Sequence, residues 1–426
     1  MIINHVIMLV VVTNMIKMKI KKKGDFMSIS KIRFKGYDNS LERKTIRDIT
    51  TSFSGGTPKS SNKSYYEGDI PFIRSGEVKS KQTELYISDE ALQNSSAKMV
   101  EKGDILYALY GATSGEVAIS QIDGAINQAI LAIKPNSEYS SEFIINYLKK
   151  EKDNILEKYL QGGQGNLSAA IVKSIELSLP SPAEQSSIGS LFRTLEDLLT
   201  SYKDNLSNYQ SLKATMLSKM FPKAGQTVPE IRLDGFEGEW EKGTIGEFGS
   251  FYYGKSAPKW SVTDEATTPC VRYGELYTKF STKIDKIYSY TSIPKDNLKL
   301  SSGNEVLVPR VGENPLDFAN CSWLSLKGVA IGEMISVYNT PNNPLFIAYY
   351  FNAKMKKEFA KRVEGGSVAN LYYTYLENIS ISVPSLPEQQ AIGTYFLNLD
   401  NLINSYQEKF SQLEILKKKL LQDMFI

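Results

Sequence analysis

The sequence carries two copies of one long segment, and this duplication limits the possible folds more than any other feature. Residues 177–222 and 381–426 align without a gap at an offset of 204, with 18 identities in 46 positions. Both copies share a Glu-Gln pair, an Ile-Gly pair and a closing Met-Phe pair. A repeat of this length indicates that one structural unit is built twice. We therefore expect a pseudo-twofold internal repeat.

Each copy has the pattern of a long helix. Pro182 and Pro387 suit a helix start, and Glu184 and Glu388 fall in the first turn, where the helix dipole favours a carboxylate. Apolar residues then recur every seven positions, at Ile188, Leu195, Tyr202, Tyr209 and Met216 and at Ile392, Leu399, Tyr406, Leu413 and Leu420. Sustained heptads predict that the two helices pack on each other as a coiled coil. The alternative is two ordinary surface helices, each packed on its own domain.

A variable block precedes each helix. Residues 32–49 resemble residues 231–248, and "GQGNL" (163–167) resembles "GSVANL" (366–371), but the intervening sequences diverge. The predicted organisation is an extension (1–26), a first block (27–180), a first helix (181–222), a second block (223–384) and a second helix (385–426). Lys23-Gly24-Asp25 must be encoded by a purine-rich run resembling a ribosome-binding site, so our hypothesis is that translation starts at Met27.

Composition excludes several kinds of catalysis. The chain has one histidine, His5, and two isolated cysteines, Cys270 and Cys321, which leaves no material for a Ser-His or Cys-His pair, a zinc site or a disulfide framework. A reducing cytoplasm is therefore expected. Net charge is +3, of which residues 1–26 contribute +4, so a DNA-binding face must be a local patch. The apolar run 6–12 is too short to span a membrane.

With these features, the chain resembles the DNA specificity subunit of type I restriction-modification systems over residues 28–426. The resemblance rests on the duplicated helices and on four segments in a fixed order: "SGGTPKSSNKSYYEGDIPFIRSGEV" (54–78), "GDILYALYGATSGEVAI" (103–119), "INQAILAIKP" (126–135) and "VLVPRVGE" (306–313). It implies an α/β (α+β) fold with two mixed α/β target recognition domains, separated by two long antiparallel coiled-coil-like helices.

The resemblance also implies a function. Each recognition domain would read one half of a bipartite double-stranded DNA target, and the helices would dock two methyltransferase (M) subunits. Restriction (R) subunits would join the full complex. The chain itself would perform no catalysis and bind no metal or cofactor, since S-adenosylmethionine, ATP and Mg would be used by the partner subunits. The helix residues expected at the spacer or partner contacts are Ile188, Leu195, Tyr202, Leu212, Ile392, Leu399, Tyr406 and Leu416.

One motif points to a different class of protein. Gly249, Gly254, Lys255 and Ser256 match G-x-x-x-x-G-K-[ST], the phosphate-binding loop of many ATPases and GTPases. The matching part of the first block, "TSFSGGTPKS", lacks this pattern, and Phe251–Tyr253 and Pro258 do not suit a nucleotide loop. We favour a glycine-containing turn that places lysines near DNA phosphates. The alternative function is an NTP-binding or nuclease enzyme; Asp69 with Glu77 faintly suggests the latter.

DNA contacts are expected from basic, aromatic and small polar residues of the two blocks. Lysine and arginine anchor phosphates, while planar or edge-seeking side chains read bases. For Arg74 and Arg272 a structural salt bridge is an equal alternative, and for Tyr110 core packing. The candidates in the first block are Lys59, Lys63, Arg74, Lys79, Tyr110, Thr113, Ser114 and Gln164. Those in the second are Lys255, Lys259, Arg272, Tyr273, Arg310 and Arg362.

Overall fold

The structure is a computed structural model that describes residues 16–18, 32–160, 166–255 and 257–425. The chain divides into two compact units. Unit 1 comprises the described residues up to Tyr202 and from Lys409 onward, and unit 2 comprises Lys203–Glu408. Of the predicted extension, only β1 (Ile16–Met18) is described; it pairs antiparallel with β2 (Ile32–Phe34). Met27, where we expect translation to start, lies outside the described residues, and the start site stays a prediction.

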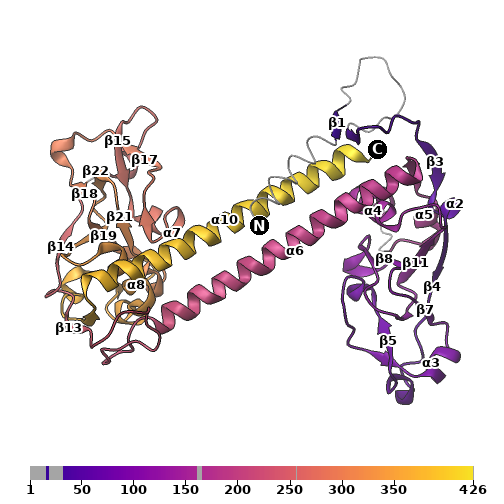
Figure 1. The fold of residues 1–426 in the computed structure, drawn as a ribbon, viewed down its shortest axis with the longest axis horizontal. Coiled ribbons are helices and arrows are strands. Elements are labelled where there is room, and N and C mark those ends of the chain that lie inside the picture. Colours follow the sequence, from indigo (N-terminus) through magenta and orange to yellow (C-terminus); the bar gives the residue numbers. More distant parts are fainter. Residues whose placement is uncertain (1–15, 19–31, 161–165, 256, 426) are drawn as a thin grey trace. The chain divides into compact units, whose positions relative to one another are not determined.

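Unit 1 is a mixed α/β block with two four-stranded sheets, ordered β4-β11-β8-β9 and β6-β5-β10-β7, and a β3-β12 pair (Figure 1). Its strands are β3 (Glu42–Thr45), β4 (Thr50–Ser54), β5 (Ile70–Ile73), β6 (Tyr86–Ile87), β7 (Lys98–Val100), β8 (Ile105–Ala108), β9 (Val117–Ile119), β10 (Gly124–Ile126), β11 (Ile130–Pro135) and β12 (Glu176–Leu179). Its helices are α2 (Ile46–Ile49), α3 (Asp89–Gln93), α4 (Ser141–Leu160) and α5 (Ala169–Lys173), with 3-10 turns η1 (Lys63–Tyr66), η2 (Ser75–Glu77) and η3 (Gly111–Thr113).

Unit 2 has sheets ordered β14-β23-β19-β21-β16, β17-β15-β22-β18 and β20-β25-β24, and a β13-β26 pair. Its strands are β13 (Glu241–Thr244), β14 (Ser250–Tyr253), β15 (Thr268–Val271), β16 (Lys283–Ile284), β17 (Ser289–Thr291), β18 (Leu300–Ser302), β19 (Glu305–Pro309), β20 (Val311–Gly312), β21 (Ser322–Leu324), β22 (Lys327–Ile331), β23 (Ile335–Asn339), β24 (Glu364–Gly365), β25 (Ala369–Asn370) and β26 (Ser380–Val383). Its helices are α7 (Tyr273–Thr278), α8 (Pro344–Lys354) and α9 (Lys356–Ala360), with 3-10 turns η4 (Lys259–Ser261), η5 (Lys295–Asn297), η6 (Pro315–Ala319) and η7 (Tyr373–Tyr375).

The central strands are almost entirely apolar because both of their faces are covered. In β8, Ile105 and Tyr107 belong to one core while Leu106 and Ala108 belong to a second core on the opposite face. β19 shows the same division in unit 2. Alternating side chains of one strand thus enter two cores, which explains a continuous apolar run rather than an alternating one.

The two units repeat the same framework. β4-β11-β8 in unit 1 corresponds to β14-β23-β19 in unit 2, and each set is antiparallel. A parallel pair follows in each, with Ile126 opposite Ile73 in one and Ile331 opposite Val271 in the other. β12-β3 and β26-β13 complete the match. The duplication read from the two helix segments therefore extends through the blocks that precede them.

The repeated Glu-Gln pair fixes the start of each long helix, α6 (Pro182–Lys219) and α10 (Leu386–Met424). Glu184 forms a buried ion pair with Arg33, and Glu388 forms the same pair with Arg232. Gln389 accepts a hydrogen bond from the Asn343 amide at 2.8 Å and donates to the Pro384 carbonyl at 2.8 Å. Gln185 makes the corresponding two contacts in unit 1. Each helix start is thus locked to the block that precedes it in sequence.

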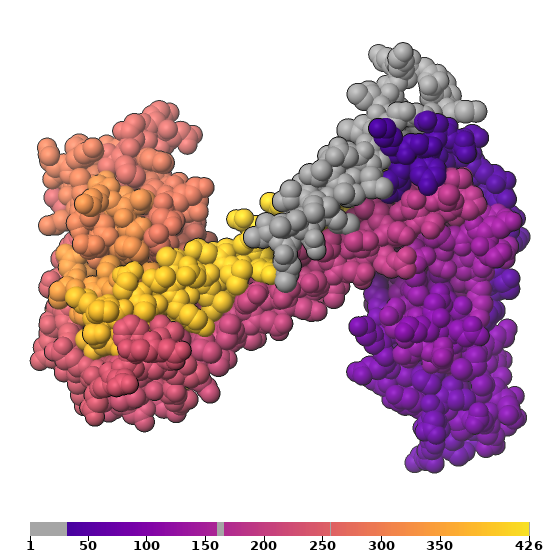
Figure 2. Space-filling view, in the orientation of Figure 1, coloured from indigo at the N-terminus to yellow at the C-terminus, as the bar shows by residue number. Residues whose placement is uncertain are grey.

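The far end of each helix is buried in the unit built around the other helix. In unit 1, Phe425 packs on Phe143 and Phe192, with ring centroids 5.1 and 5.7 Å apart. In unit 2, Phe221 stacks on Phe396 at 5.8 Å. The helices therefore run antiparallel within each unit, as predicted, and the alternative of two separately packed surface helices is wrong. In Figure 2 the surface of α10 (yellow) lies directly against that of residues 203–240.

Most seam residues occupy the predicted inner positions. Ile188, Leu195, Ile392 and Leu399 are buried, and Tyr202, Tyr406 and Leu416 are half-buried. Leu212 is 38 % exposed and lies outside the seam, so its expected place at a spacer or partner contact stays a prediction. Lys213 lies inward instead and pairs with Asp400. Within the described ranges, no helix is long and apolar enough to cross a membrane.

Candidate nucleic-acid interface

The turn that carries the Gly-Lys-Ser pattern has a counterpart in unit 1. β14 ends at Tyr253 and is followed by Gly254, just as β4 ends at Ser54 and is followed by Gly55. A Cβ on Gly254 would lie 2.1 Å from the carbonyl oxygen of Gly332, and one on Gly55 would lie 1.8 Å from that of Ile126. Both glycines are required because the chain passes against the end of a parallel strand, where a side chain has no room.

The backbone of this turn is not available to a phosphate. The Gly254 amide donates to the Ile335 carbonyl at 3.0 Å, and the Lys255 amide donates to the Ile331 carbonyl at 2.9 Å. The next element is η4, a single 3-10 turn rather than a helix. A phosphate-binding loop needs free amides at the N-terminus of a helix. Gly254 and Lys255 therefore form a structural turn after β14, although Ser256 itself lies outside the described residues.

The faint nuclease pattern is also explained by the fold. Burial alone would raise the pKa of Glu77, but hydrogen bonds from the Arg74 side chain and amide, the Glu84 amide and the Thr83 hydroxyl lower it to about 2. Glu77 thus closes the turn η2 as an ionised cap. The described part of the chain contains no group of three or more His, Cys, Asp or Glu residues that could hold a metal ion.

Four predicted phosphate contacts lie on the surface. Lys59 and Lys63 are exposed in the segment after Gly55 and Gly56, and Lys255 and Lys259 are exposed in the corresponding segment of unit 2. Trp260, beside Lys259, is also largely exposed. Each framework thus carries lysines after the same glycine turn. Lysines in this setting suit phosphate anchoring, which positions a protein on DNA without reading sequence.

Arg74 and Arg272, two predicted DNA contacts that each come shortly before a Gly-Glu pair, occupy equivalent positions. Their side chains have different partners. Arg74 donates to Glu77 at 2.9 Å and to Glu84 at 2.6 Å, and these hydrogen bonds raise its pKa. The structural salt bridge is thus formed at Arg74. At Arg272 only the amide contacts Glu275, at 3.0 Å, and the half-buried side chain lies beside the partly exposed Tyr273. Of the two arginines, Arg272 has the freer side chain for a DNA contact.

The small-residue turn 110–115 follows β8. Tyr110 is partly exposed rather than buried in the core, and it pairs with Asn166 as an isolated β-bridge. Thr113 is half-buried. Ser114 is only 6 % exposed and its hydroxyl donates to the Leu109 carbonyl at 3.2 Å, so it supports the turn instead of facing a ligand. Lys79 is exposed but forms an ion pair with Glu116. Gln164 lies outside the described residues.

In unit 2, Arg310 occupies the position that Leu109 has in unit 1, directly before the turn that follows the strand. Its carbonyl accepts from the Leu371 amide at 2.8 Å, as the Leu109 carbonyl accepts from the Leu167 amide at 2.9 Å. Its guanidinium carbon lies 4.4 Å from the ring centroid of Tyr253 and 5.3 Å from that of Tyr372. The guanidinium therefore contacts two aromatic rings, which favours cation–π attraction.

Arg362 lines a cationic cavity of about 590 Å³ in unit 2, together with Lys242, Lys354 and Lys357. Burial lowers the pKa of Lys354, which donates to the Ser218 carbonyl at 2.7 Å. Arg362 itself is paired with Glu358 at 2.9 Å. This cavity concentrates positive charge, which suits an anionic ligand such as a phosphate.

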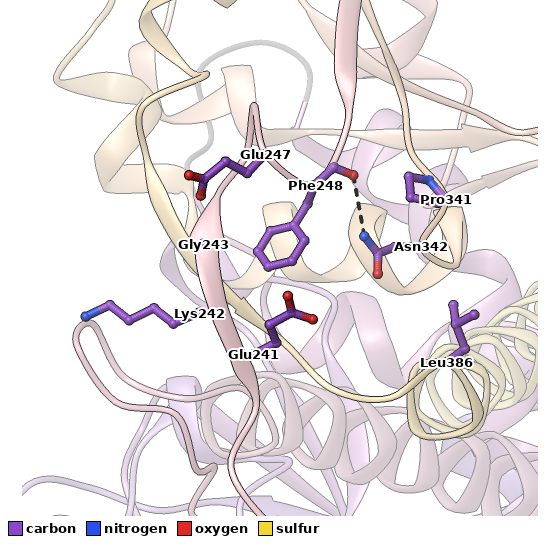
Figure 3. A pocket seen from close by; sticks show the side chains of 8 residues that line it. All are labelled: Glu241, Lys242, Gly243, Glu247, Phe248, Pro341, Asn342 and Leu386. Atoms are coloured by element: carbon purple, nitrogen blue, oxygen red, sulfur yellow. Dashed lines mark hydrogen bonds between the residues drawn. The ribbon is translucent and has the colours of Figure 1, made fainter.

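A second cavity, of about 550 Å³, lies between β13 and the start of α10 (Figure 3). Glu241 and Glu247 contribute carboxylates, and Asn342 donates to the Phe248 carbonyl at 3.5 Å. Neither Arg310 nor its ring partners Tyr253 and Tyr372 line this cavity. With its two carboxylates it is poorly suited to DNA phosphates.

Two blocks on one repeated framework, paired long helices and exposed lysines after the same glycine turn define a protein of the DNA-recognition class. The sequence pattern of the type I restriction modification DNA specificity domain matches residues 39–209 and 237–414. The chain belongs to this family of type I restriction-modification specificity subunits, which are non-catalytic DNA-recognition subunits.

Individual relatives agree with the family match. The chain is 24 % identical over 392 residues to the type I restriction enzyme MjaIX specificity subunit of Methanocaldococcus jannaschii, covering 88 % of this chain and 89 % of that protein. It is 22 % identical over 370 residues to the MjaVIII specificity subunit of the same organism, covering 79 % and 84 %. The crystal structure of the type I S subunit from M. genitalium shares the fold, with a TM-score of 0.58, 15 % identity and coverage of 92 % and 97 %.

Sequence reasoning missed the aromatic partners of Arg310. Tyr253 lies in "FYY" and Tyr372 in "LYYTY", and both runs are visible in the sequence. The first run was interpreted only as an obstacle to a nucleotide loop. Tyrosine-rich segments that flank loops were the available signal, because amphipathic rings suit surfaces that contact both polar and apolar groups.

Proposed function

We propose that this specificity subunit reads a bipartite double-stranded DNA target, with one half-site recognised by each block. The observation that carries the proposal is the repeated framework, on which the residues at equivalent turns differ between the units. A shared framework positions each block on DNA in the same way, while different side chains at the turns select different bases. This function is exercised in the cytoplasm, where the DNA lies.

Phosphate anchoring falls to the exposed lysines after the glycine turns. Lys59 and Lys63 serve the first block, and Lys255 and Lys259 serve the second. Lys255→Ala should weaken binding to all sequences alike and make its salt dependence shallower, because one fewer counterion is released. Gel-shift titrations across a salt series measure this, with Lys418→Ala on the exposed surface of α10 as the matched control. Weakened binding to one sequence only would contradict phosphate anchoring.

The long helices set the distance between half-sites and dock two M subunits. A helix of 38 residues, the length of α6, is about 57 Å long, more than one DNA turn of about 34–36 Å. The target should therefore be two short half-sites around a gap of unspecified bases. R subunits join the complex, and its S-adenosylmethionine, ATP and Mg are used by the partner subunits rather than by this chain.

Docking of M subunits should use the outward face of the helices rather than their seam. The seam residues are buried or half-buried against the paired helix, so they are not free for a partner. Exposed apolar side chains remain on the outside, namely Leu212, Leu386, Leu402 and Ile415. Ile415→Glu should reduce co-purification of M subunits without loss of helix content.

Exchange of the first block tests the assignment of one block to one half-site. Residues 30–176 are replaced by the corresponding block of another specificity subunit, and methylome sequencing of the resulting strain reads the modified motif. We expect one half of the motif to change and the other half and the gap to stay. A hybrid that alters both halves, or neither, would show that the blocks do not act independently.

A further inference from the structure

Arg310 stands out among the described arginines because it is held by aromatic rings and by no acid. The Nε atom is buried and has no hydrogen-bond partner among the described atoms. No ion pair joins Arg310 to a described carboxylate, whereas the half-buried Arg74, Arg232 and Arg362 each have one. A buried guanidinium nitrogen without an acceptor is costly. Since no described acid neutralises Arg310, a ligand that reaches its remaining donors can supply the counter-charge.

The rings are themselves held in place. Tyr253 packs on Tyr373 at 4.6 Å, and Tyr373 stacks on Phe251 at 5.5 Å with an interplanar angle of 6°. Tyr372 packs on Tyr375 at 6.0 Å. The two rings that contact the Arg310 guanidinium are therefore restrained by other aromatic rings. Restrained rings hold the guanidinium before any ligand arrives.

Unit 1 lacks the arginine and the two tyrosines, Arg310, Tyr253 and Tyr372, that pack together in unit 2. Arg310 corresponds to Leu109, which is 2 % exposed and part of the core. The strand register places Ser54 at the position of Tyr253, and the position after Leu167 is Ser168 where unit 2 has Tyr372. A core leucine and two serines in one repeat are thus an arginine and two tyrosines in the other. The shared framework forms without this contact between an arginine and two tyrosines. The contact therefore serves a purpose specific to the second block.

We propose that Arg310 reads a guanine in the half-site recognised by the second block, an inference that rests on the proposed function. Because two rings contact the guanidinium and Nε is buried, the terminal Nη atoms are the donors left for a ligand. Their edge offers two parallel donors, which match the O6 and N7 acceptors of guanine in the major groove. A phosphate contact needs charge but no fixed plane, and a flexible lysine supplies that equally well. The preorganised edge therefore indicates base reading.

The test compares three variants by methylome sequencing and by gel shift of the assembled complex. Arg310→Ala should relax the second half-site at one G·C pair, so that other bases are accepted there, while the first half-site and the gap stay. Binding to the cognate site should fall by about 5- to 150-fold. Arg310→Lys keeps the charge but lacks the planar fork, and it should not restore discrimination. Tyr253→Ser, which introduces the unit 1 residue, should relax the same pair.

Outcomes separate this inference from the proposed function. Uniform weakening with an unchanged motif, or full rescue by Arg310→Lys, would show a phosphate contact and overturn the inference. An unchanged motif and unchanged affinity in Arg310→Ala would overturn it as well. In either case the exchange of residues 30–176 still decides whether each block reads one half-site. Arg310→Met, which keeps the side-chain stem against the rings, must relax the same pair even where the alanine variant fails to assemble.

Discussion

Removal of Glu388 should destabilise unit 2 specifically. The Arg232 Nε and Nη2 atoms donate to the two carboxylate oxygens of Glu388 at 2.8 and 2.7 Å. The side chain of Glu388 is 1 % exposed and that of Arg232 17 %. The same arginine donates to the carbonyls of Glu237 and Gly238. The pair therefore joins the first turn of α10 to the segment before β13, and Glu388→Ala leaves a largely buried cation without its partner.

The expected magnitude follows from this burial. Removing one partner of a buried pair costs about 3–5 kcal/mol, because the remaining charge is desolvated and uncompensated. The urea dependence of unfolding for a unit of this size is about 2.5–3 kcal/mol per molar. Dividing the first by the second gives a midpoint lowered by about 1–2 M urea.

Tryptophan fluorescence makes the assay specific to unit 2. All three tryptophans of the chain, Trp240, Trp260 and Trp323, belong to that unit, and Trp240 is buried in its core. The matched control is Glu184→Ala, which removes the equivalent partner of Arg33 in unit 1. Effects at distant sites without shared contacts are independent, so Glu184→Ala should leave the tryptophan transition in place.

Two results would refute this reasoning. One is a tryptophan midpoint in Glu388→Ala that stays at the wild-type urea concentration. The other is an equal shift of that midpoint in Glu184→Ala, which would show that the units do not unfold separately. The double variant Arg232→Met with Glu388→Leu removes both charges and keeps apolar volume. It should recover most of the lost stability, since the penalty comes from the unpaired charge.

Three further predictions test other parts of the account. Stability contributed by Glu77 is present above its unfolded pKa of 4.5 and lost as the pH falls toward its folded value of about 2; acid unfolding followed by circular dichroism should therefore be flatter in Glu77→Gln than in wild type. Gly254→Ala should lower the urea midpoint measured by tryptophan fluorescence, because the added methyl group would meet the Gly332 carbonyl, whereas Lys255→Ala should leave that midpoint unchanged. If calorimetry showed that the wild-type chain binds ATP and that Lys255→Ala does not, the assignment of a structural turn would be contradicted. Four residues inserted after Tyr202 in α6 and again after Glu408 in α10 add about 6 Å of helix, so methylome sequencing should find the gap longer by one or two base pairs, and methylation only at the original spacing would exclude the helices as spacers.

The sequence by itself determined the architecture at the level of units and helices. The gap-free repeat, the heptads and the first-turn carboxylates are local patterns, and the structure confirms two repeated α/β blocks and antiparallel helices. Such features can be read from one chain because periodicity reports which face of an element is buried. The glycine turn was also readable, since Gly254 and Gly55 fall at matching places and only one of them is followed by Lys-Ser.

Only the tertiary structure determined which individual side chains are buried and which partners they contact. The helix pattern could not tell that Leu212 is exposed while the neighbouring Lys213 is half-buried and pairs with Asp400. Composition could not tell that Arg74 is neutralised by two glutamates while Arg310 has none. Arg310 contacts Tyr253, which lies 57 positions before it in the sequence, and Tyr372, which lies 62 positions after it. Contacts of that kind depend on how strands pair in space, and no local pattern encodes them.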